Sequence, residues 1–170
     1  MEWINDIYVN VSKIKNSYLY GEHEKYTVMI QDGFTVFLNR DSVVNILPEV
    51  LRRANKGDLV FGQNRSGINY PKELYDELEK AALRGVEIKV IMPFASGTTP
   101  LSKFLIKIKN NIEVRLSREE YVRIFGIKGK EIVIAFPMSN SFYGIHLTDE
   151  QISNHFFKLF HDTWQKARRI

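Results

Sequence analysis

Residues 121–136 read YVRIFGIKGKEIVIAF, and apolar side chains recur there at alternate positions on both sides of a basic centre. Alternation with a period of two is the pattern of a β-strand that is buried on one face. The centre, Lys128-Gly129-Lys130, has the short glycine-containing form of a tight turn. The stretch therefore predicts a β-hairpin, two strands joined by a basic turn.

This hairpin resembles the catalytic motif of the phospholipase D superfamily. Members of that superfamily carry His-x-Lys-x4-Asp on such a hairpin, followed by glycine and by a strand that ends in a Gly-Ser-x-Asn-like segment. Aligned with that pattern, Tyr121 takes the His position, Arg123 the Lys position and Lys128 the Asp position. Gly129 matches the motif. Residues 135–138, at the Gly-Ser-x-Asn position, offer neither a hydroxyl nor an amide side chain.

The three replacements remove the chemistry of the motif. In the superfamily the His attacks phosphorus as a covalent nucleophile, and we do not expect Tyr121, which also lacks the partner acid, to do so. Lys128 inverts the charge at the position of the Asp that orients the His. The resemblance therefore implies a phospholipase D-like domain without catalytic residues. A residual phosphodiesterase or nuclease is the third and last of our functional hypotheses.

Length and composition predict a single soluble globular domain over residues 1–170. The chain has 44% hydrophobic and 26% charged residues, and its length allows a substantial core. It has no Cys, which excludes a disulfide framework and a Cys-ligated zinc site. No apolar run approaches the roughly 18 residues of a membrane span, and the N-terminus lacks the basic start of a signal peptide. We therefore expect a cytoplasmic protein without a transmembrane segment and without a cofactor.

The periodicity along the rest of the chain predicts further strands and helices. Predicted strands are 26–30, 34–38, 58–62, 86–92, 112–116 and 142–147. Predicted helices are an amphipathic one over about residues 1–20, one that Asp41 caps and that runs from Ser42 to Leu51, others at 71–84 and 101–108, and a last one that Thr148 or Asp149 caps. Pro48 lies inside the second helix, so that helix either begins late, near Pro48, or is kinked there.

The order of these elements predicts a mixed α/β fold. Strand 58–62, the helix after it and strand 86–92 form a βαβ unit, which requires a parallel pair of strands and a right-handed crossover. We expect a mixed, mainly parallel sheet with helices on both faces, corresponding to one half of a phospholipase D-like fold. The helix at 1–20 lies outside this core. It is either a packing helix or a helix for dimerisation or domain linkage.

The closing passage resembles a second group of proteins. Residues 144–149, GIHLTD, followed by Phe156, Phe160 and Trp164, are similar to the tail of the sensor domains of archaeal TrmB-like transcription regulators. Those domains are phospholipase D-like without the catalytic residues, and they bind small ligands such as sugars. The resemblance implies a non-catalytic ligand-sensing or regulatory domain connected with transcription. It also implies a homodimer, because superfamily members with one motif copy complete their site from two chains.

A candidate ligand site follows from the strand order. Ligand sites in open α/β sheets lie beyond the carboxyl ends of parallel strands. Asn64 and Arg65 follow the strand that ends at Gly62, and the hairpin brings Tyr121 and Arg123 towards the same edge. We predict that these four residues surround a polar concavity, with Asn64 and Arg65 on the wall opposite the hairpin, and that it takes a small anionic or sugar-like ligand.

Arg123 is the residue of that set with the most specific chemistry. Its guanidinium offers a pair of parallel donors to a phosphate or a carboxylate. The alternative is a solvated strand residue that is paired with Glu113 or Glu131. Four histidines are present, but no two have the spacing of metal ligands on one helix face, so we assign no metal site.

The second functional hypothesis is a binding module for nucleic-acid or anionic-lipid phosphates. The net charge is +4, and basic residues are concentrated between residues 103 and 130. A patch of Lys103, Lys107, Lys128 and Lys130 would bind phosphates through a mainly electrostatic, salt-sensitive interaction. The alternative for this run of charges is a solvated face without a partner.

Overall fold

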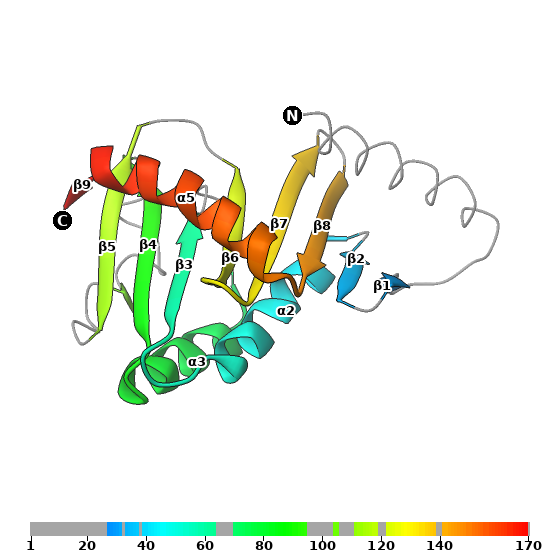
Figure 1. The fold of residues 1–170 in the computed structure, drawn as a ribbon, viewed down its shortest axis with the longest axis horizontal. Coiled ribbons are helices and arrows are strands. Elements are labelled where there is room, and N and C mark those ends of the chain that lie inside the picture. Colours follow the sequence, from blue (N-terminus) through cyan, green and yellow to red (C-terminus); the bar gives the residue numbers. More distant parts are fainter. Residues whose placement is uncertain are drawn as a thin grey trace.

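The computed structural model of the protein describes residues 27–31, 33–37, 39–63, 70–94, 104–105, 111–118, 122–138 and 141–169. These residues form one mixed sheet with helices on both of its faces (Figure 1). The helix predicted for residues 1–20 lies outside the described residues, as does most of the helix predicted for 101–108.

The sheet has nine strands in the order β1-β2-β8-β7-β6-β3-β4-β5-β9. Their bounds are β1 Thr27–Gln31, β2 Phe34–Phe37, β3 Leu59–Gln63, β4 Glu87–Pro93, β5 Ile112–Ser117, β6 Arg123–Ile127, β7 Glu131–Met138, β8 Ser141–Leu147 and β9 Arg168–Arg169. The described helices are α2 Arg40–Arg53, α3 Lys72–Leu83 and α5 Glu150–Lys166. None of these helices is both long enough and apolar enough to cross a membrane.

The mixed α/β class with helices on both faces is confirmed, and the βαβ unit predicted from β3, α3 and β4 is present. The share of parallel pairs is smaller than we expected. β4 pairs in parallel with β3 and with β5, whereas the other described strand pairs are antiparallel. The reason is that β6, β7 and β8 follow one another through short connections, and a short connection joins antiparallel strands.

The basic hairpin is confirmed as the pair β6 and β7. Ile127 lies opposite Glu131 and Arg123 lies opposite Ala135. In the turn, Gly129 has a φ of 72°, a left-handed conformation that favours glycine. Gly126 is required for another reason, since a Cβ there would stand 2.3 Å from the carbonyl oxygen of Glu131.

Helix α2 begins earlier than the sequence predicts. Its N-cap is Asn39 and not Asp41, because the Asn39 side chain accepts a hydrogen bond of 2.8 Å from the backbone N–H of Ser42. The helix runs through Pro48 as one element instead of starting there. A proline inside a helix costs about 3 kcal/mol. Buried apolar residues on both sides of it, among them Leu47 and Val50, offset that loss.

Two apolar cores hold the helices to the sheet. Helices α2 and α3 pack behind the sheet in Figure 1, on a cluster that includes Leu51, Leu78 and Ile127. Helix α5 crosses the front face diagonally and packs Phe156, Phe160 and Trp164 on that side, where Phe61 is buried. Of the two caps predicted for α5, the structure has Asp149, which accepts from the N–H of Ile152 at 2.8 Å.

Candidate functional site

The carboxyl end of β3 and the start of β6 meet at one edge of the sheet. The two strands are antiparallel neighbours, and Gln63 at the end of β3 lies opposite Ile124. Arg123 is the residue before Ile124, so the motif-derived position lies beside the end of a parallel strand. This is the edge at which open α/β sheets bind ligands.

A cavity of about 70 Å³ lies between this part of the sheet and helices α2 and α3. Both helices and several strands contribute to its wall. The described residues that line it are Val43, Val44, Leu47, Gly62, Gln63, Tyr70, Leu74, Leu78, Val90, Leu105, Arg123, Ile124, Phe125, Val133 and Ala135. Most of them are buried, and the partly exposed ones are Tyr70, Arg123 and Phe125.

Arg123 is the charged residue among those described lining residues. Side chains alternate along a strand, so Arg123 shares a face of β6 with Phe125 and Ile127, which pack on the α2 and α3 side. The Nε atom of Arg123 is buried. Its side chain therefore stands in the wall of the cavity and not on an open face of the sheet.

The two glutamates considered as partners of Arg123 bind other cations. Glu113 pairs with Arg115 at 3.0 Å and with Arg169 at 3.2 Å. Glu131 pairs with Arg53 and His146. The structure therefore does not support the alternative in which Arg123 pairs with Glu113 or Glu131.

The other predicted ligand residues, Tyr121, Asn64 and Arg65, lie outside the described residues, and their place around the cavity stays a prediction. The polar character that we predicted is not what the described wall shows. That wall is mostly apolar, because the apolar faces of α2 and α3 reach as far as this edge. The sequence signal was available in Leu47, Leu74 and Leu78, which are apolar positions of the two predicted helices.

The predicted phosphate patch stays a prediction, and the structure describes two of its four lysines. Lys103 and Lys107 lie outside the described residues. Lys128 and Lys130 are in the β6–β7 turn, at the other end of β6 from Arg123. The ammonium of Lys128 lies 4.6 Å from the ring centre of Phe157, and that of Lys130 binds Asp58 Oδ2 at 2.7 Å. Both of these lysines therefore have intramolecular partners.

A buried carboxylate near that turn was missed by the sequence. Glu131 is 3% exposed and receives two hydrogen bonds from Arg53, at 2.9 and 2.6 Å. The Nε2 atom of His146 lies 2.7 Å from Glu131 Oε2. Burial alone would raise the pKa of the Glu131 carboxyl, but the hydrogen bonds with His146 and Arg53 outweigh burial and lower that pKa.

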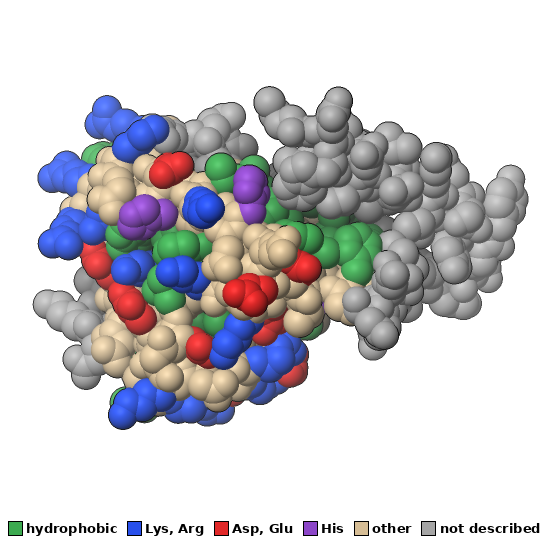
Figure 2. Space-filling view, viewed as in Figure 1, with side chains coloured by type: hydrophobic (Ala, Val, Ile, Leu, Met, Phe, Trp, Pro, Cys, Tyr) green, Lys and Arg blue, Asp and Glu red, His purple; other side chains and the backbone are tan. Residues whose placement is uncertain are grey.

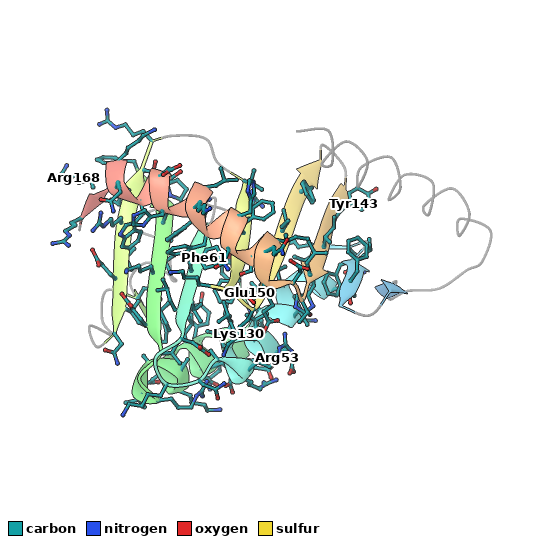
Figure 3. All side chains as sticks on the ribbon, viewed as in Figure 1. Arg53, Phe61, Lys130, Tyr143, Glu150 and Arg168 are labelled. Atoms are coloured by element: carbon teal, nitrogen blue, oxygen red, sulfur yellow. The ribbon has the colours of Figure 1, made fainter. Side chains whose placement is uncertain are left out.

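This Glu131 cluster joins the end of α2 to β7 and β8, since Arg53, Glu131 and His146 come from those three elements. In Figure 3, Arg53 and Lys130 lie at the lower end of the sheet, whereas Arg168 lies at its upper left. Glu131 lies opposite Ile127, at the other end of β6 from Arg123. Arg53 and Glu131 are 78 residues apart in sequence, so no local pattern predicts their contact.

Basic residues also gather around an exposed aromatic ring at the carboxyl ends of β4 and β5. The ring is that of Phe94, which is 39% exposed. The guanidinium carbon of Arg118 lies 4.7 Å from the ring centre and that of Arg168 lies 6.0 Å from it. Figure 2 shows several Lys and Arg side chains at this end of the molecule, and others along its lower side. We refer to Phe94, Arg118 and Arg168 as the arginine–phenylalanine cluster.

No group of three His, Asp or Glu side chains in the described part of the chain is arranged to hold a metal ion. The carboxylates of Glu113 and Glu131 are bound to Arg115 and Arg53.

Known proteins match this chain in structure, but none matches it in sequence. No protein-family model and no functionally curated protein matches the sequence. The structure resembles that of TrmBL2, an archaeal chromatin protein that shows a novel mode of DNA binding, with a TM-score of 0.69 and 17% identity. That likeness covers 99% of this chain and 64% of TrmBL2, so the chain spans less than two thirds of that protein.

Two further solved structures are also similar. Nuc from Salmonella typhimurium, a phospholipase D family member, has a TM-score of 0.60 at 15% identity, over 81% of this chain and 98% of Nuc. NucT from Helicobacter pylori has a TM-score of 0.65 at 12% identity, over 81% of this chain and 98% of NucT. The fold of this chain is therefore phospholipase D-like and similar to that of TrmB-like proteins.

Proposed function

Because the fold is phospholipase D-like, we propose that this chain is a non-catalytic regulatory domain that binds a small ligand where the superfamily places its catalytic site. The observation that carries the proposal is the position of Arg123. It stands at the Lys position of the motif, at the carboxyl edge of β3, and lines a cavity. A guanidinium in a cavity wall is suited to bind an anionic group.

The residues at the motif positions support binding without turnover. Catalysis of phosphodiester cleavage by this motif needs a nucleophile and a charge-balancing acid, and the chain has Tyr121 and Lys128 at those positions. Lys128 is exposed and lies over Phe157. Lys128 has no carboxylate that could accept a proton or balance the charge of a nucleophile.

We further propose that the domain acts in transcription or chromatin regulation as a homodimer. The likeness to TrmBL2 supports the first part, and the single motif copy supports the second. A cytoplasmic location remains a prediction from the sequence.

The test of ligand binding uses thermal unfolding with a panel of sugars, sugar phosphates, organic acids and nucleotides. We expect at least one class to raise the unfolding midpoint of the wild type and not that of Arg123→Ala. Arg118→Ala, which removes an exposed arginine outside the cavity, is the matched control. The same preparations are assayed with bis-p-nitrophenyl phosphate. Turnover that is lost in Tyr121→Phe, or a panel without any Arg123-dependent ligand, would contradict the proposal.

Nucleic-acid binding is the second candidate function, and the arginine–phenylalanine cluster is the observation that favours it. An exposed ring flanked by guanidinium groups offers a stacking surface for a base together with contacts to phosphates. TrmBL2, which has a similar fold, is a DNA-binding protein. The phosphate patch of Lys103, Lys107, Lys128 and Lys130, for nucleic acid or for anionic lipid, stays a separate prediction.

Fluorescence anisotropy with labelled single-stranded and duplex DNA tests this candidate. We expect an affinity that falls steeply as salt rises, since phosphate contacts release counterions. Arg118→Gln with Arg168→Gln should weaken binding, whereas Arg123→Gln should not. Affinity that is unchanged in the double variant would exclude the cluster as the contact surface.

A further inference from the structure

We propose that the Arg123 cavity takes a short-chain organic anion, whose hydrocarbon part fills the apolar interior and whose carboxylate pairs with Arg123. This inference rests on the proposed function and narrows it to one chemical class of ligand. Its basis is the combination of three features: a described wall that is mostly apolar, a small volume, and Arg123 as the cationic residue of that described wall.

The apolar wall comes from both layers that enclose the cavity. Helix α2 contributes Leu47, helix α3 contributes Leu74 and Leu78, and the sheet contributes Val90 and Val133. Each of these side chains is at most 8% exposed. An apolar group that enters the cavity therefore leaves water almost completely, at a gain of about 25 cal/mol per Å² of apolar surface buried.

The volume limits the length of the ligand. A dry apolar cavity of about 150 Å³ is known to hold benzene. The cavity here is about 70 Å³, roughly half of that, which corresponds to a chain of about three or four carbon atoms. A longer chain has to leave its end outside or push the wall apart.

The cationic group decides the sign of the ligand's charge. Arg123 is charged, and the described lining residues include no Asp, Glu or Lys. A guanidinium has five N–H donors, so Arg123 can hold a neighbouring group of the protein and still offer a pair of donors to a carboxylate. Charge attraction is strong beside an apolar wall, where water screens it little.

The same wall disfavours a sugar, the other ligand class that the sequence predicted. A sugar buries several hydroxyl groups, and each one that finds no hydrogen-bond partner weakens binding. The polar residues among the described wall are Gln63, Tyr70 and Arg123. Within the described wall, these three side chains offer few partners for the hydroxyls of a hexose.

Isothermal titration calorimetry with linear alkanoates, in a buffer without carboxylate or phosphate, tests the inference. From acetate to butyrate we expect affinity to rise about fourfold for each added methylene, the ratio expected for one buried CH₂. Affinity should level off at about pentanoate, because the cavity is then full. Butan-1-ol, which has the chain without the charge, should bind at least tenfold more weakly than butyrate.

Three variants and one control variant locate the binding. Arg123→Gln should reduce butyrate affinity at least tenfold, while Arg118→Gln leaves it unchanged. Ala135→Leu grows a side chain directly opposite Arg123 and adds three carbon atoms, so it should abolish binding by filling the cavity. Val133→Ala removes two carbon atoms from the wall and enlarges the cavity. The alkanoate that binds this variant most tightly should therefore be about one methylene longer than for the wild type. Thermal unfolding of each variant verifies that it is folded.

The outcomes separate this inference from the proposed function. If a sugar or a nucleotide binds in an Arg123-dependent way and alkanoates do not, the ligand class is wrong and the proposed function stands. If nothing binds, both are wrong. Alkanoate binding that survives in Arg123→Gln and in Ala135→Leu would place the ligand elsewhere and overturn the inference alone.

Discussion

Arg123 differs from the lysine of the phospholipase D motif in what its side chain can bind. A lysine is a point charge, whereas a guanidinium is a planar fork that matches a carboxylate. In this chain the fork lies in the wall of an apolar cavity. At the scale of single residues, this difference supports our proposal that Arg123 binds an organic anion.

The first prediction concerns Arg123 directly. Arg123→Ala should weaken binding of the ligand by roughly 1.5 to 3 kcal/mol, the range for a lost hydrogen bond to a charged group. The free energy of unfolding should change little, because the side chain lines a cavity and is partly exposed. Calorimetry gives the first quantity and urea unfolding the second. A large loss of stability would mean that Arg123 is structural.

The second prediction concerns Glu131, whose pKa is lowered in the folded protein. A carboxyl with a lowered pKa stabilises the fold at pH values above the ordinary Glu pKa of about 4.3, and this contribution is lost as the pH falls through the folded-state pKa. Glu131→Gln should therefore lower the free energy of unfolding by roughly 1.5 to 3 kcal/mol at neutral pH. The difference from the wild type should shrink in acid.

Urea unfolding between pH 3 and pH 7 measures this difference. Glu79→Gln, at an exposed position of α3, controls for the loss of one negative charge. If the difference between wild type and Glu131→Gln were constant across this range, the Glu131 carboxylate would not be the titrating group.

At the scale of elements, the position of α2 depends on one glycine of the neighbouring strand. A Cβ at Gly144 in β8 would stand 2.3 Å from a methyl carbon of Val43 in α2. Gly144 is therefore needed for the close approach of the helix to the strand. Gly144 is the first residue of GIHLTD, the passage that resembles the TrmB-like sensor domains. That glycine is therefore also needed for packing.

The third prediction tests this contact with a double-mutant cycle. Gly144→Ala should destabilise the fold by roughly 1 to 3 kcal/mol, the range for overpacking. Val43→Ala removes the methyl groups that clash, so the double variant should lose at least about 1 kcal/mol less than the two single losses together. Urea unfolding supplies the change in free energy of unfolding for each of the three variants. Additive losses would show that Gly144 and Val43 do not restrict each other.

The elements themselves were largely predictable from the sequence. The hairpin of residues 121–136 and the βαβ unit follow from local periodicity and from the glycines in their turns, and both are present. The cap at Asn39 was not predicted, because Asp41 is an equally good capping residue and only the folded backbone selects between them. Strand β9 has two residues, too few for any periodicity.

The candidate site was less predictable, for physical reasons. Motif alignment placed Arg123 at the correct edge of the sheet, since that step needs only strand order. The apolar cavity depends on how α2 and α3 pack against the sheet. A leucine that lines a cavity, such as Leu78, has the same sequence signature as one in a filled core. The contacts of Glu131 and of Phe94 join segments that are far apart in the sequence. No local sequence pattern could therefore predict them.

At the scale of the whole molecule, the sheet has a parallel part, β3 to β5, and an antiparallel part around β7 and β8 (Figure 1). The Arg123 cavity lies where these two parts meet, because β3 and β6 are the neighbours that join them. A ligand there contacts both parts of the sheet together with α2 and α3. A ligand at such a site could change how the two parts of the sheet and the two helices pack against one another.

The fourth prediction concerns assembly. If the domain is a homodimer, light scattering should give a mass near 40 kDa, twice the 19.9 kDa of the chain. The mass should not depend on Arg118 or Arg168, which belong to the exposed arginine–phenylalanine cluster. A mass of one chain at all accessible concentrations would exclude the dimer without affecting the ligand site.

The most direct test of the account is a nuclear magnetic resonance titration that follows the Nε–H signal of Arg123, assigned by its absence in Arg123→Gln. We expect butyrate to shift this signal, to saturate at the affinity given by calorimetry, and to leave it unmoved in Ala135→Leu. If the Arg123 signal stays fixed with butyrate and with every anion of the panel, the residue at the motif position binds no ligand and the central claim is wrong.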